Sequence, residues 1–343
     1  MIPPHIFPGM LALLLTVAAP AAWAAKPSVV ATIAPVHSLV AGVMEGVGTP
    51  GLLLKGGASP HSYALRPSDV RALNSADLVF RVDENLETFL NKSLRMLPNN
   101  IRVVELSGVE GVKLLEVREG GVWGVHGHGH DEEHTDHDDH DVHGKEYAAH
   151  EEEHDDHNEG EKHAAHEANE HGHNPHLWLD PANAKIWVNA IARELGEIDP
   201  ANRNRYRANA AGLIQQLEVL EKELNGQLSP VKERPYIVFH DAYHYFEERF
   251  DLHPVGSISV GDAGAPGARR LTEIRRVIRE RGALCVFAEP QFEPLLVRTV
   301  IEGSGARSGV LDPLGARLEP GPGLYFELMR ALARELVRCL GGA

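Results

Sequence analysis

Residues 126–173 concentrate the side chains that most readily bind metal ions. This stretch holds 14 of the 21 histidines and 17 acidic residues, against only two lysines. Neutral imidazole and carboxylate are both good ligands for divalent first-row metals, so the composition predicts metal capture. In the first part of the stretch the histidines are closely spaced, so neighbouring imidazoles can chelate one ion. These histidines are His126, His128, His130, His134, His137, His140 and His143.

The same stretch is low in complexity and has too few apolar residues to offset the entropy of ordering it. We therefore expect a flexible loop with many equivalent, moderate binding geometries; a tolerated insertion without a role is the alternative. The stretch also carries −15 of the chain's net charge of −16, so the remainder is nearly neutral. Without a basic stripe to replace phosphate counterions, a nucleic-acid partner is excluded.

Three isolated histidines are better candidates for a tight site. His240 ends the apolar run 236–239, His61 follows the apolar run 51–54, and His176 precedes a helical pattern that begins near residue 181. In open α/β sheets, ligands gather beyond the carboxyl ends of strands. We therefore expect the three imidazoles to meet in a cleft, although their spacing is too wide for a local motif.

Two further histidines could bind a metal by their positions, but we assign structural roles to them. His244 lies four residues after His240, a spacing that can chelate on a helix. No H-E-x-x-H frame surrounds it, so we expect an exposed helical histidine. His37 falls in a helical pattern near the expected cleft, and Trp178 and Trp187 are expected to pack in the core.

Strand and helix patterns alternate in both halves of the chain. This alternation predicts an α/β fold of two lobes, each with a mainly parallel sheet flanked by helices. The expected N-terminal lobe covers 25–180 and the C-terminal lobe 200–343, joined by a long, rigid helix over 181–199. Asp180 as N-cap and Pro181 at the first helical position mark the start of that helix.

The first 24 residues resemble a signal peptide, with the apolar run LALLLTVAAPAA and an A-x-A cleavage site at 22–24. The run is too short for a membrane anchor, although its amino-terminal flank lacks Lys and Arg. Export makes a disulfide the favoured state of the two cysteines, Cys285 and Cys339. Such a bridge would stabilise the fold by about 4 kcal/mol on the chain-entropy model.

Five motifs, in order along the chain, resemble the ZnuA-type zinc-binding proteins of bacterial ABC uptake systems. The likeness runs from about residue 28 to the C-terminus, and the His-rich insertion stands where such proteins often carry one. The motifs are GGASPHSYALRPSD (56–69), NPHLWLDP (174–181), VFHDAYHYFE (238–247), CVFAEPQF (285–292) and LDPLG (311–315).

This resemblance implies a metal held between the lobes by His61, His176 and His240. Some relatives use a Glu just before the first histidine, but Pro60 occupies that position here. The resemblance nominates Asp312 as fourth ligand, with water as the alternative, and gives Glu289 a supporting role behind the ligands. It also implies the Cys285–Cys339 pairing.

The expected function is that of a periplasmic Zn²⁺ receptor, a monomer that delivers zinc to an ABC permease with a cytoplasmic ATPase. Three imidazoles suit tetrahedral zinc, whereas manganese would favour more oxygen ligands. A zinc-dependent hydrolase is the main alternative, because three histidines plus water can also be catalytic. No general base other than Glu289 is identifiable, so no enzyme is expected. A metal buffer or chaperone is the remaining alternative.

Overall fold

The computed structural model describes residues 26–118, 123, 172–259, 266–292 and 295–342. The expected signal peptide and the seven tract histidines from His126 to His143 lie outside these ranges. Within them, no helix combines the length and apolar character needed to cross a bilayer.

The N-terminal half forms one parallel sheet. Its strands are β1 (Val29–Ala31), β2 (Gly51–Leu52), β3 (Leu78–Arg81) and β4 (Arg102–Glu105), in the order β2-β1-β3-β4. The helices between them are α1 (Ala34–Val43), α2 (Pro67–Asn74) and α3 (Thr88–Leu94). Because each connection is a crossover, all carboxyl ends of the strands lie on one edge of the sheet.

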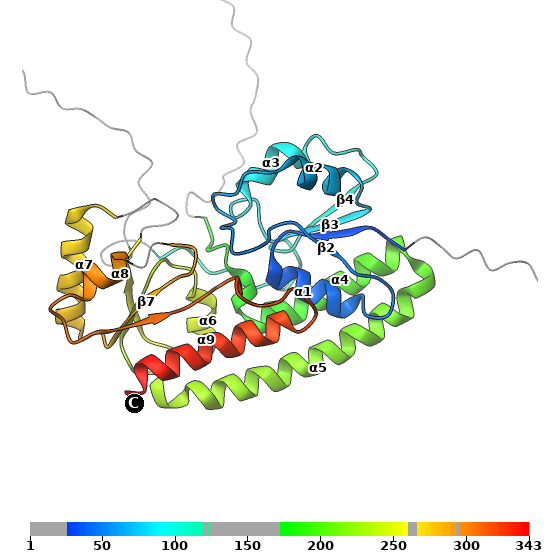
Figure 1. Ribbon diagram of the computed structural model, residues 1–343. Coiled ribbons are helices and arrows are strands. Elements are labelled where there is room, and N and C mark those ends of the chain that lie inside the picture. Colours follow the sequence, from blue (N-terminus) through cyan, green and yellow to red (C-terminus); the bar gives the residue numbers. More distant parts are fainter. Residues whose placement is uncertain (1–25, 119–122, 124–171, 260–265, 293–294, 343) are drawn as a thin grey trace, which may run out of the picture.

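The C-terminal half repeats this plan with a second parallel sheet, ordered β6-β5-β7-β8. Its strands are β5 (Tyr236–Val238), β6 (Pro254–Ser257), β7 (Cys285–Ala288) and β8 (Arg307–Val310). Its helices are α6 (His244–Phe250), α7 (Ala268–Arg281), α8 (Leu295–Ile301) and α9 (Leu324–Leu340). The expected two-lobed α/β fold is confirmed (Figure 1).

Helices fill the region between the two sheets. The turn η2 (Leu177–Leu179) leads into α4 (Pro181–Ile198), followed by η3 (Pro200–Asn202), α5 (Arg203–Leu228) and η4 (Ser229–Val231). The Asp180 carboxylate accepts a hydrogen bond from the Ala182 N–H at 2.8 Å, so the expected N-cap is confirmed. The longer α5 packs against α4 and α9 and runs along both halves (Figure 1). The domain boundaries remain a prediction.

A hydrophobic core continuous across the two halves holds the sheets and these helices together. Trp178 and Trp187 are fully buried within it, as expected. A smaller core lies against the second sheet, around Ile237 and Val286. The Cys285–Cys339 disulfide is confirmed and ties β7 to α9. The sheets are thus fixed against shared helices, which limits how far the loops at their edges can separate.

The end of the His-rich stretch belongs to the folded structure, unlike the expectation of a flexible loop as far as residue 173. His173 forms an antiparallel bridge with Glu116, and the Val117 N–H donates to the Gly172 carbonyl at 3.3 Å. The His173 Nε2 atom lies 2.9 Å from Asp83 Oδ2. We call residues 115–118 and 172–174 the stalk, because they are two paired segments, one before the His-rich stretch and one at its end.

Candidate metal centre

The three candidate histidines come from three separate loops. His61 lies between β2 and α2, His176 immediately precedes η2, and His240 is the second residue after β5. Among the described residues, they form the one group of three or more potential ligands whose donor atoms lie within 4.8 Å of one another. The structure therefore brings together the three imidazoles that the sequence nominated.

The ligand atoms face each other at distances that suit a small tetrahedral ion. His176 Nε2 lies 3.2 Å from His61 Nε2 and 3.2 Å from His240 Nε2. Two nitrogens bound to zinc at about 2.0–2.1 Å with a tetrahedral angle stand about 3.3 Å apart. The cluster thus approximates the ligand spacing of a zinc site.

The hydrogen bonds behind two of these rings determine which nitrogen faces the centre. The Asn174 Oδ1 atom accepts the His176 backbone N–H at 3.1 Å and lies 2.9 Å from His176 Nδ1. His240 Nδ1 lies 2.7 Å from Glu289 Oε1. Because both partners are acceptors, each Nδ1 carries the proton and each Nε2 directs a lone pair inward. Lone pairs 3.2 Å apart repel unless a cation or proton lies between them.

The surroundings of the cluster bury His176 and favour its neutral form. His176 and His240 are buried, whereas His61 is partly exposed. Burial, followed by the nearby His240 and His61, lowers the pKa of His176 well below its ordinary value. All three histidines line a narrow cavity that also includes Trp178 and Phe292. A neutral imidazole is the form that binds a metal, so this environment favours metal over protons.

Adjacent strands place Glu289 behind His240. β5 and β7 are neighbours in the sheet, so the residues that follow them lie side by side. Glu289 is buried at 2% exposure, and its Oε1 contacts the His240 ring. A carboxylate bonded to the outer nitrogen of a histidine fixes the ring and increases its basicity as a ligand.

Asp312 lies outside the group of three histidines whose donor atoms are within 4.8 Å of one another. Its Oδ1 accepts the backbone N–H groups of Leu314 and Gly315 at 3.1 and 3.0 Å, and its Oδ2 accepts that of Ala316 at 2.7 Å. These bonds occupy the carboxylate and shape the loop whose Pro313 and Leu314 line the cavity. An acidic residue in a turn can cap backbone amides as readily as it can bind a metal. The sequence pattern did not distinguish these roles.

The other two histidines lie outside the cluster. The His37 Nε2–H donates to the Pro50 carbonyl at 3.1 Å, a buried structural contact. The expectation that His244 is exposed is wrong: it begins α6 but is half-buried, and burial lowers its pKa. The reason is that the stalk packs over α6, where the Leu115 N–H donates to Tyr245 Oη at 3.0 Å.

Two polar residues at the centre were missed by the sequence interpretation. Asn174 contacts His176, and Arg118 binds Asp241, the residue that follows His240. Asn174 stands two residues before His176 within NPHLWLDP, so its position gave a weak signal. Arg118 gave none, because its carboxylate partners are more than 120 residues away in the chain.

Two parallel-sheet lobes with a histidine centre between their loops define a solute-binding protein of the metal-receptor class. The family model ZnuA, "Zinc-uptake complex component A periplasmic", matches residues 29–339. The chain belongs to this family, whose members are periplasmic receptors of zinc uptake rather than enzymes.

Curated relatives and solved structures agree with this assignment. The high-affinity zinc uptake system protein ZnuA of Brucella abortus (strain 2308) is 46% identical over 315 residues, 92% of each chain. That of Paracoccus denitrificans is 42% identical over 333 residues, 97% of each chain. A crystal structure of ZnuA superimposes with a TM-score of 0.70 at 23% identity, covering 92% of this chain and 100% of the other. At that identity the structural likeness supports the fold alone.

Proposed function

We propose that this chain is the periplasmic receptor of a high-affinity ABC zinc uptake system, and that His61, His176 and His240 bind the transported Zn²⁺. The observation that carries the proposal is the convergence of three imidazole nitrogens, two contacts of which measure 3.2 Å. Zinc is the cargo here, so the protein needs to bind and release it without changing it chemically.

Water is the proposed fourth ligand. The partly exposed His61 leaves one side of the cluster open, and the carboxylate of Asp312 is bonded to the backbone of its own loop. Three nitrogens plus one water satisfy tetrahedral zinc, whereas Mn²⁺ favours a higher number of oxygen ligands. The site should therefore select zinc over manganese.

The export, oligomeric state and partners of the protein are proposed from its sequence. The first 24 residues direct export and are removed near Ala24, and the mature chain acts as a monomer. The receptor delivers zinc to a membrane permease powered by a cytoplasmic ATPase. The histidines of residues 126–173 gather zinc near the cleft, since tethered sites raise the local concentration of their ligand.

Metal content and binding stoichiometry test the proposal. Wild-type protein should retain one tightly bound zinc per chain after dialysis, and the triple variant His61→Ala, His176→Ala, His240→Ala should retain none. A matched control replaces the exposed His253 with Ala and should behave as wild type. Tight binding that persists in the triple variant would show that the site lies elsewhere.

A further inference from the structure

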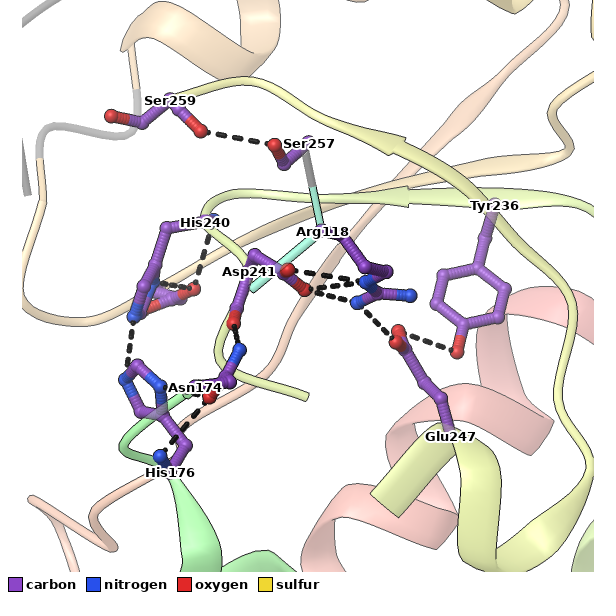
Figure 2. Close-up of polar contacts among 10 residues, drawn as sticks. Arg118, Asn174, His176, Tyr236, His240, Asp241, Glu247, Ser257 and Ser259 are labelled. Carbon is purple, nitrogen blue, oxygen red and sulfur yellow. Dashed lines mark hydrogen bonds and ion pairs between the residues drawn. The ribbon is translucent and has the colours of Figure 1, made fainter. Parts of the chain in front are cut away.

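One carboxamide, that of Asn174, bridges the two chain segments that carry the buried histidines. Its Oδ1 accepts from the His176 backbone and ring, as described above. Its Nδ2 donates to the carbonyl of Asp241 at 2.6 Å (Figure 2). Because Asp241 directly follows His240, this single side chain links the segment of His176 to that of His240.

The bridge is anchored at its own backbone. The Asn174 N–H donates to the Leu115 carbonyl at 2.8 Å, and the Asn174 carbonyl accepts from Tyr245 Oη at 2.8 Å. Asn174 is 2% exposed. The backbone that carries the carboxamide therefore cannot shift without breaking its contacts to Leu115 and Tyr245.

Arg118 holds the opposite end of the bridge. Its Nε lies 3.0 and 3.1 Å from the two carboxylate oxygens of Asp241, and its Nη2 bonds both Asp241 and, at 2.7 Å, Glu247 Oε2. Glu247 Oε1 in turn accepts from Tyr236 Oη at 3.0 Å (Figure 2). The guanidinium also lies over the Trp123 ring, 3.6 Å from its centroid. A planar fork with this many partners fixes Asp241 more firmly than a single contact could.

We propose that Asn174 is a positioning residue that sets the separation of the His176 and His240 ligand atoms, and that Arg118 fixes the Asp241 side of this bridge. The inference rests on the proposed zinc site. Its physical basis is that tetrahedral zinc tolerates little change in ligand distance, so an outer residue that spans two ligand segments controls affinity. Loss of such outer partners typically costs about 10–100-fold in metal affinity.

The sharpest test is Asn174→Leu, which keeps the approximate size of the side chain but can neither accept from His176 nor donate to the Asp241 carbonyl. We expect about 10–100-fold weaker zinc binding by chelator competition. In the Co²⁺-loaded protein we expect a shifted visible spectrum, which reports ligand geometry. The matched control is Asn209→Leu, since Asn209, near the start of α5, also donates from Nδ2 to backbone carbonyls, those of Val43 and Glu45. The control should leave both readouts unchanged.

A second variant tests the other end of the bridge and covers the case in which Asn174→Leu does not fold. The double variant Arg118→Gln, Glu247→Gln removes the clamp while keeping the total charge of the buried group. It should weaken zinc binding and shift the Co²⁺ spectrum in the same direction.

The outcomes separate this inference from the proposed function. If the wild type binds zinc tightly and loses it in the triple histidine variant, the proposed site stands. If in that case the folded bridge variants keep wild-type affinity and the wild-type Co²⁺ spectrum, the positioning role is overturned alone. A fall in melting temperature without change in either readout would likewise show a merely structural role.

Discussion

The His240 ring donates its Nδ1–H to Glu289 Oε1 across 2.7 Å, from the end of one strand to the end of its neighbour. Replacing Glu289 with Ala should weaken zinc binding about 10–100-fold, because the ring loses both its orientation and the basicity that the carboxylate supplies. Glu289→Gln should fall between wild type and Ala. Chelator competition measures the change, and Glu223→Gln, at a surface ion pair with Arg330, is the charge-matched control. Unaltered affinity in Glu289→Ala would remove Glu289 from the site.

Asp312 offers a test of the fourth ligand. Asp312→Ala should destabilise the protein by about 1–3 kcal/mol, because the backbone N–H groups of residues 314–316 lose their acceptor. Zinc affinity should change much less than in His240→Ala, since the fourth ligand that we propose is water and not Asp312. Denaturant unfolding and zinc titration of the same samples separate the two effects. A loss of affinity equal to that of a histidine variant would make Asp312 a ligand after all.

The His173–Asp83 pair predicts a pH-dependent contribution to stability. The hydrogen bond to Asp83 raises the pKa of His173 despite partial burial. Burial raises the pKa of Asp83, but hydrogen bonds from His173, Ser107 and the Asn85 backbone outweigh this and lower it to about 2. His173 therefore stabilises the fold fully below about pH 6.5, and this contribution is lost as the pH rises through its folded pKa. The Asp83 contribution is present above about pH 4 and is lost as the pH falls toward 2.

Accordingly, His173→Gln should cost about 0.5–1 kcal/mol more at pH 5.5 than at pH 8.5, a value discounted for the partial exposure of the ring. Glutamine can still donate to Asp83, so the difference isolates the charge. Denaturant unfolding at both pH values measures it, with the exposed His253→Gln as control. An equal cost at the two pH values would mean that His173 carries no charge in this pair.

A variant that lacks the His-rich stretch should keep the ordered stalk intact. Replacing residues 124–171 with a short Gly-Ser linker leaves Gly172 and His173 in place against Val117 and Glu116. One tight zinc site should remain and the weaker sites should disappear in calorimetric titration. A variant in which all histidines of 124–171 become Ser keeps the length and serves as the control. Disappearance of the tight site in both variants would place a ligand within the stretch.

The sequence determined the local structure of this protein. The apolar runs at 236–239 and 285–288 predicted buried strands, and the residues after them were therefore expected at a sheet edge. Asp180 followed by Pro181 had to begin a helix, because the carboxylate caps free N–H groups and proline fits the first turn. These features depend on neighbours in the chain and are therefore readable from the chain.

Tertiary structure decided what each polar side chain contacts. Asp312 had the right type for a ligand, but its own loop provided three N–H groups within reach. His244 is half-buried where the stalk packs against α6, and His173 contacts Asp83 and Glu116. The bridge from His176 through Asn174 to the residue beside His240 joins segments 67 residues apart. No local pattern encodes such contacts, because their geometry exists only once the two sheets have packed against the shared helices.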